Sequence, residues 1–144
     1  MPSLNQIKKS LVQFFDGHAQ INQVAYCDEK DFAAMRDITY PAANIEYLDS
    51  NINGNLMTHR FVFNLEDLAD ENIPGIEDEI YSDMLEVAED FYSWLWEQLD
   101  YQFTKQATIE KYVDKGGDRV AGISFRINLT TVRRQNPCVI PTKA

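Results

Sequence analysis

The sequence contains few of the residues that usually carry enzyme chemistry. It has two cysteines and two histidines among 144 residues. Cys27 and Cys138 lie far apart and fit no metal or redox spacing, which favours two reduced thiols. His18 and His59 share no motif, and His59 falls on the apolar side of an alternating segment, as a structural histidine would. These scarcities argue against a nucleophile–base pair and against a histidine-bound metal.

Recognisable catalytic motifs are also missing. The sequence has neither of the glycine-rich motifs G-x-x-x-x-G-K-[ST] and G-x-G-x-x-G, which would signal a phosphate site, and no G-x-S-x-G nucleophile elbow. The acid-rich segment 69–79 crowds carboxylates as a two-metal nuclease might, but without an accompanying His or Lys a solvated loop is expected. We therefore expect no enzymatic activity and no cofactor, and an acid-dependent metal enzyme is the least favoured hypothesis.

Positive charge and long apolar runs are scarce too. Lys and Arg number 13 against 23 Asp and Glu, for a net charge of −10. This balance disfavours a nucleic-acid-binding surface or an anionic membrane surface, both of which need basic residues. It suits a soluble protein, or a surface that nucleic acid passes without binding. No apolar run approaches a membrane span and the N-terminus lacks a signal-peptide layout, so we expect a cytoplasmic protein.

The stretch DSNINGN resembles the start of an EF-hand calcium loop. Asp49, Asn51, Asn53 and Gly54 occupy positions 1, 3, 5 and 6 of that motif. Position 12, which should be a bidentate glutamate, is Arg60. A turn is therefore the preferred interpretation, with a weak calcium site formed by the aspartate and two asparagines as the alternative.

The residues around this stretch predict a β-hairpin. Apolar and polar residues alternate through LMTHRFVFNL, which is the period of a strand. Asn and Gly tolerate the positive φ that tight hairpin turns require. The sequence therefore predicts strands over about 44–49 and 56–65.

Upstream, the pattern predicts two helices and a strand. Ser3 and Gln6 form a capping box before apolar residues at helical spacing, and Gly17 is a plausible stop. Residues 23–27 read as a short strand. The segment 28–37, with its acids first and Arg36 late, predicts a short helix.

A long helix is predicted from Ile76 to about Phe103, because no Gly or Pro interrupts that segment. One apolar stripe at about 100° per residue consists of Ile80, Met84, Val87, Ala88, Phe91, Leu95 and Leu99. A second stripe beside it consists of Tyr81, Leu85, Tyr92 and Trp96. Together they cover roughly 200° of the circumference, about twice the arc of an ordinary surface helix. Because Tyr and Trp are enriched at interfaces, we expect the second stripe to contact another chain.

The remaining face of this helix is acidic. Its members are Glu79, Asp83, Glu86, Asp90 and Glu97. The simplest interpretation is a solvated face. The functional alternative is a wall that faces a lumen and repels DNA phosphates.

The last third predicts two more strands and a tail. TIEKYV alternates, a turn follows at 114–118, and a final strand over 123–131 directs Ile123, Phe125, Ile127, Leu129 and Thr131 to one side. The tail begins at about residue 133. Its apolar Val139 and Ile140 are further candidates for the interface.

These elements predict an α+β fold: a mostly antiparallel sheet of four or five strands against a long central helix and an N-terminal helix. The length predicts one domain over residues 1–144 with an extended C-terminal tail.

Four segments carry a resemblance to a known group of proteins. TYPAANIEYLD leads into the hairpin, FYSWLWEQL lies in the long helix, VAGISFRINLTTV forms the final strand and NPCVIP closes the chain. From about Leu4 to Pro141 the chain resembles the tail-terminator and tail-completion (head–tail connector) proteins of tailed bacteriophages, in length, element order and segment texture. No functional residue is carried over from that group, which has no catalytic or metal motif to match.

The resemblance implies a homo-oligomeric ring, commonly a hexamer, that caps the tail tube and docks it to the neck. Tail-tube and neck proteins would be its partners, and DNA would pass through the ring unbound. The protein would reside in the virion and, during assembly, in the host cytoplasm. Arg126, Arg133 and Arg134 depart from an acidic lumen and favour an acidic neighbour. The alternative function is a small cytoplasmic adaptor that binds a protein partner through the aromatic stripe.

Overall fold

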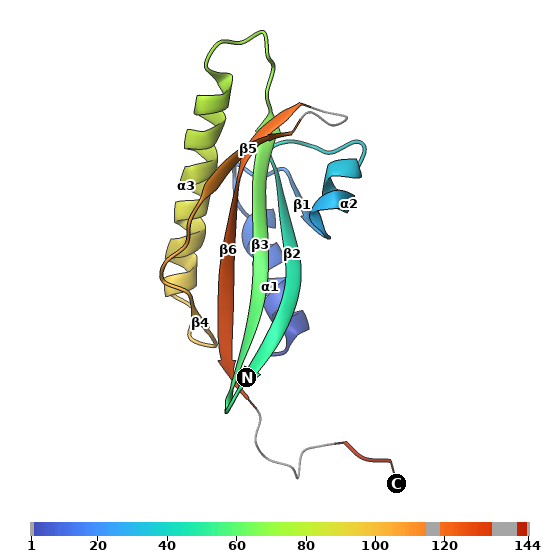
Figure 1. Ribbon diagram of the computed structural model, residues 1–144, viewed down its shortest axis with the longest axis vertical. Coiled ribbons are helices and arrows are strands. Elements are labelled where there is room, and N and C mark those ends of the chain that lie inside the picture. The colour runs from blue at the N-terminus through green and yellow to red at the C-terminus, as the bar shows by residue number, and fades with distance from the viewer. Residues whose placement is uncertain (1, 115–118, 134–140, 144) are drawn as a thin grey trace.

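The fold, described from a computed structural model, is a mixed six-stranded sheet with helices packed on it (Figure 1). The structure describes residues 2–114, 119–133 and 141–143. The elements run in the order α1 (Leu4–Asp16), β1 (Gln23–Tyr26), α2 (Glu29–Ala34), β2 (Ala42–Asn53), β3 (Leu56–Leu68), α3 (Ile76–Trp96), β4 (Gln102–Phe103), β5 (Glu110–Asp114) and β6 (Val120–Val132). The predicted α+β class is confirmed, with six strands where four or five were expected.

The strand order is β1-β2-β3-β6-β4, and β5 also pairs with β6. All pairs are antiparallel except β1 with β2. Parallel neighbours need a crossover connection, and here α2 lies within it. Both β4 and β5 occupy the same edge of β6, separated by the irregular segment 104–109.

The first helix begins, and the hairpin turns, where local features of the sequence predict. Ser3 and Gln6 make the reciprocal capping box at the start of α1, and Gly17 ends that helix. The hairpin turns at Gly54 and Asn55, directly after Asn53 pairs with Leu56. Gly54 has a φ of 60°, which matches a glycine-first two-residue turn. Strand β2 extends beyond its predicted range at both ends, whereas β3 begins at Leu56 as predicted and continues three residues further, to Leu68.

Helix α3 is shorter than predicted. It ends at Trp96, where the backbone N–H groups of Glu97 and Gln98 donate to Trp94 and Leu95 in a tight last turn. The predicted continuation to Phe103 is wrong because Tyr101 and Phe103 turn back and bury themselves against the sheet. Part of the expected helix is therefore the short strand β4.

One core fills the space between the sheet and the two long helices. From α1 it takes Ile7, Leu11 and Phe15, and from α3 six buried apolar residues headed by Phe91. The Phe91 ring lies 4.9 Å from the rings of both Phe15 and Phe63. All five alternating residues of β6 from 123 to 131 are buried on this side, as predicted. Among the described residues, no helix is long and apolar enough to cross a membrane.

Candidate interaction surfaces

The second stripe of α3 faces the β4–β5 edge of the sheet. Tyr81 and Tyr92 are half-buried there, whereas Leu85 and Trp96 are 39% and 62% exposed. The stripe is therefore divided, with two residues packed by their own chain and two left open. We call this side of the molecule, formed by α3, β4 and β5, the α3 flank.

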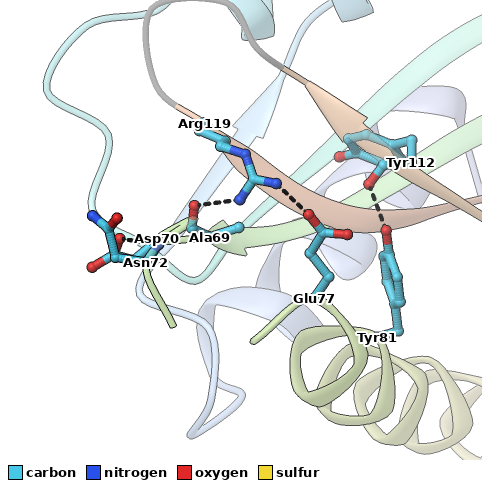
Figure 2. A network of polar contacts seen from close by, with 7 residues as sticks. All are labelled: Ala69, Asp70, Asn72, Glu77, Tyr81, Tyr112 and Arg119. Atoms are coloured by element: carbon cyan, nitrogen blue, oxygen red, sulfur yellow. Dashed lines mark hydrogen bonds and ion pairs between the residues drawn. The ribbon is translucent and has the colours of Figure 1, made fainter. Parts of the chain in front are cut away.

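At the N-terminal end of α3, the α3 flank is fixed by polar contacts (Figure 2). Arg119, just before β6, donates to the carbonyl of Ala69 at 2.9 Å and pairs with Glu77. Tyr81 donates to the backbone carbonyl of Tyr112 at 3.5 Å. These contacts join the first turns of α3 to the ends of β3, β5 and β6. Tyr81 thereby has a structural contact within its own chain.

At the C-terminal end of α3, the α3 flank is aromatic and more open. The Tyr92 and Trp96 rings both lie edge-on to Phe103, at 5.8 and 5.3 Å. The Lys105 ammonium sits 3.7 Å from the centre of the Trp96 ring. The Tyr92 hydroxyl is buried and has no hydrogen-bond partner among the described residues.

Leu99 corrects the predicted first stripe. The other six members are buried in the core, but Leu99 is 97% exposed because the helix ends before it. It lies three residues after Trp96, so the chain leaves two large apolar side chains open at the end of α3. Leu99 was expected in the core and is a surface residue.

The five acidic residues predicted for this face are all exposed, but Glu97 lies just beyond the last residue of α3. Asp90 pairs with His18, whose Nε2 lies 2.8 Å from the carboxylate. The structure thus keeps the acidic face of α3 at the surface, away from the sheet. The remaining interface candidates, Val139 and Ile140, lie outside the described residues, as does Arg134.

The calcium candidates lie on a strand. The register places Asp49, Asn51 and Asn53 opposite Arg60, Thr58 and Leu56 in the hairpin. Both carboxylate oxygens of Asp49 accept from the Arg60 guanidinium, which lowers the pKa of Asp49. Arg60, which stands where the calcium loop would have its glutamate, therefore binds the Asp49 carboxylate that calcium would need. Among the described residues, no cluster of three His, Cys, Asp or Glu side chains could hold a metal.

His59 is buried in the sheet, as expected for a structural histidine. Its Nδ1 lies 2.6 Å from the Ser50 hydroxyl, which in turn lies 2.5 Å from the Tyr47 hydroxyl. Burial lowers the pKa of His59, which favours its neutral form. The three groups form a hydrogen-bonded chain that joins β2 to β3.

Sequence reasoning missed a groove on the other face of the sheet, between α2 and β5, which is lined by both polar and apolar residues. We call it the α2–β5 groove. It has a volume of about 490 Å³, and its lining includes Phe32, Asn64, Glu66, Tyr112 and Ser124. The register explains the grouping, because Asn64 lies opposite Ser124 and Glu66 lies opposite Gly122. Alternation alone could have grouped Glu110, Tyr112 and Asp114, but not their neighbours on β3.

Gly122 makes room for the main contact in the α2–β5 groove. It pairs with Glu66 on one side and with Tyr112 on the other. The Tyr112 hydroxyl donates across it to the Glu66 carboxylate at 2.9 Å. A Cβ at Gly122 would lie 2.3 Å from the Leu65 carbonyl oxygen and 2.8 Å from the Glu66 Cβ. Glycine is required here by close packing, not by an unusual φ.

The electrostatics around the α2–β5 groove are negative. Among the described residues, its lining carries the acids Glu29, Glu66, Glu110 and Asp114 and one cation, Lys30. Burial and then the neighbouring carboxylates, led by Glu66, raise the pKa of Tyr112. Burial and then Glu29 and Asp28 likewise raise the pKa of Glu46. The groove therefore favours positively charged groups.

A search of protein-family models and of curated proteins found no match to this chain.

Proposed function

We propose that this protein is a structural virion protein of a tailed bacteriophage that forms a homo-oligomeric ring at the head–tail junction. In this role it caps the tail tube and docks it to the neck, with no catalytic step. The observation that carries the proposal is the exposed apolar end of the α3 flank. Trp96 and Leu99 are exposed to solvent and do not belong to the buried core.

Exposed aromatic residues of this kind favour contact with another chain. A single exposed apolar residue is ordinary, but Trp96 is large, and Leu85 and Leu99 lie on the same helix or directly after it. Trp is enriched in protein interfaces because it buries much area at little entropic cost.

A ring needs two different patches on each copy, one for each neighbour. The sheet offers two open edges on opposite sides of the molecule, β1 on one side and β4 with β5 on the other (Figure 1). The α3 flank includes the second edge. In a head-to-tail contact, the α3 flank of one copy would bind the β1 edge of the next. Each copy would then bind one neighbour through each patch, as a ring requires.

The acidic face of α3 is compatible with a lumen wall. Its five carboxylates are exposed and do not pack on the sheet. Such a surface repels DNA phosphates, so the genome could pass without binding. Together with the resemblance of the sequence to tail-terminator proteins, this supports a ring of six copies around a DNA channel.

The oligomeric state tests the first part of this proposal. We expect light scattering with size-exclusion chromatography, and negative-stain images, to show a ring or a concentration-dependent oligomer. Trp96→Glu should reduce the assembled fraction, because it places a charge in the contact. Ile73→Glu changes another exposed apolar residue, just before the N-terminal end of α3 and so at the opposite end of that helix from Trp96, and should leave assembly intact. A chain that stays monomeric at high concentration, both alone and with tail tubes, would contradict the ring.

The place in the virion needs a separate experiment. We expect labelled antibodies against this chain to bind at the neck of intact particles, and the gene to lie between capsid and tail genes. A chain that is absent from purified virions and instead captures one host protein through Trp96 would support the adaptor alternative.

A further inference from the structure

Charge in this protein is divided along the sequence. The chain has a net charge of −10, yet residues 119–144 contain no Asp or Glu and carry Arg119, Arg126, Arg133, Arg134 and Lys143. Three of these cations belong to the last twelve residues. The protein therefore combines an acidic groove with a basic C-terminal segment.

Two polar side chains, those of Asn64 and Glu66, lie at the bottom of the α2–β5 groove, where a ligand could contact them. Asn64 is 4% exposed and Glu66 is 7% exposed. The Asn64 side chain lines the cavity and makes no hydrogen bond that links it to other described residues. The Asn64 amide can be reached from the groove, so it can donate to or accept from a ligand that enters there. Glu29 and Glu110, both exposed, stand at the rim and add negative charge.

We propose that the α2–β5 groove binds the basic C-terminal segment, residues 133–144, of a neighbouring copy of this chain. The inference rests on the proposed function, since it adds a second contact between neighbouring copies of the ring to the one between the α3 flank and the β1 edge. Arg134 and Lys143 supply the charge that the groove lacks, and the backbone of the segment can donate to Asn64.

Geometry makes this contact intermolecular. The Arg133 backbone N–H donates to Asn55, and its side chain donates to Gly54, so the segment begins at the hairpin tip. Ser124, in the groove, precedes Arg133 by nine residues of strand, or about 30 Å at 3.4 Å per residue. Figure 1 shows β5 and the end of β6 at opposite ends of the sheet.

The C-terminal segment is too short to place both Arg134 and Lys143 in the α2–β5 groove of its own copy. Arg134 directly follows the anchored Arg133, so it cannot span about 30 Å, and even a fully extended chain gains only about 3.5 Å per residue. Lys143 could reach only if the whole segment, which includes Pro137 and Pro141, ran back fully extended. A neighbouring copy presents its segment without this constraint.

Fluorescence anisotropy with a synthetic peptide tests the contact directly. The labelled peptide covers residues 132–144, with Ser in place of Cys138 to prevent oxidation, and the full-length protein is titrated into it. We expect saturable binding that weakens at high salt. Replacing Arg134 and Lys143 of the peptide by Glu should weaken binding by at least about tenfold, the size expected for loss of one charge-assisted hydrogen bond.

Matched protein variants locate the site. Glu29→Lys with Glu110→Lys reverses two exposed charges of the α2–β5 groove, and we expect it to weaken peptide binding by about tenfold or more. Asp83→Lys with Glu86→Lys makes the same change in net charge on α3 and should alter binding by less than about threefold, since these sites are exposed and distant. Circular dichroism confirms that both variants fold.

The outcomes separate this inference from the ring itself. If the peptide does not bind, or if the groove and helix variants weaken it equally, the tail–groove contact is wrong even where the protein assembles. If the peptide binds through the groove while the full chain stays monomeric under every condition, the ring is wrong and the groove still recognises a basic segment. Loss of binding in the groove variant alone supports the inference.

Discussion

The two faces of the sheet are built from the same strands but use them differently. The face under α1 and α3 is filled by large apolar rings, with Phe63 and Phe125 stacked 5.2 Å apart. The other face is lined by Asn64, Glu66 and Ser124, and holds the α2–β5 groove. One face stabilises the fold through area removed from water, whereas the other depends on a few polar contacts whose geometry must be right. Substitutions should therefore act by different mechanisms on the two faces.

Phe91→Ala should have the largest effect, because it removes a fully buried ring at the centre of the helix-covered face. We expect a loss of about 3–5 kcal/mol in the free energy of unfolding. Urea denaturation followed by circular dichroism measures it. Arg126→Ala on β6, an exposed position of the polar face, is the control and should change stability little. Similar losses at the two positions would contradict the contrast between the faces.

Gly122→Ala tests close packing on the polar face. The added Cβ would meet backbone and side-chain atoms of Leu65 and Glu66. We expect a loss of about 1–3 kcal/mol, typical of overpacking, measured by the same denaturation. Ser124→Ala, two residues along the same face, removes one atom without a clash and serves as control. An unchanged stability in Gly122→Ala would show that β3 and β6 lie further apart than described.

Tyr112→Phe removes one hydroxyl from the polar face and leaves its ring in place. Glu66 loses the donor at 2.9 Å. We expect a loss of about 1–2 kcal/mol, together with a change in peptide binding in the α2–β5 groove. Tyr26→Phe removes the hydroxyl of another half-buried tyrosine, at the end of β1, and is the control. If both variants were as stable as the wild type, the hydrogen bond between Tyr112 and Glu66 would not contribute to stability.

The smallest effect concerns pH and His59 on the helix-covered side. Burial lowers the pKa of His59 below its ordinary value of 6.5, so the unfolded state binds the proton more readily. The stabilising contribution of the neutral imidazole is present above pH 6.5 and is lost as pH falls from there through the folded-state pKa. His59→Asn should reduce this loss between pH 7.5 and 5.5, as denaturation at each pH would show. Parallel pH profiles for the two proteins would rule out this contribution.

Much of the fold followed from local signals. The capping box at Ser3, the alternation in β3 and β6 and the buried stripe of α3 all lie within short segments, so the sequence displays them. The end of α3 did not follow, because residues 97–103 have helical composition and only the chance to bury Tyr101 and Phe103 ends the helix earlier. The pairing of β1 with β2 in parallel also depends on contacts between distant segments.

The candidate surfaces were predictable in part. The exposure of Trp96 and of the acidic face follows from helical periodicity, and the structure agrees with both. Helical periodicity could not predict that Tyr81 and Tyr92 pack on β5 and β4, because it describes only α3 itself and not its contacts with later strands. The α2–β5 groove escaped prediction entirely, since its lining joins α2, β3, β5 and β6 through the register of the sheet.

By itself, the sequence determined which residues avoid water, where the first helix and the hairpin begin, and how charge is distributed along the chain. Those properties depend on side-chain chemistry and on neighbours within a few residues. The tertiary structure alone decided which polar residues meet, as Glu66 and Tyr112 do across Gly122. Such meetings are set by strand register, and register is fixed by packing between segments that are far apart in the sequence.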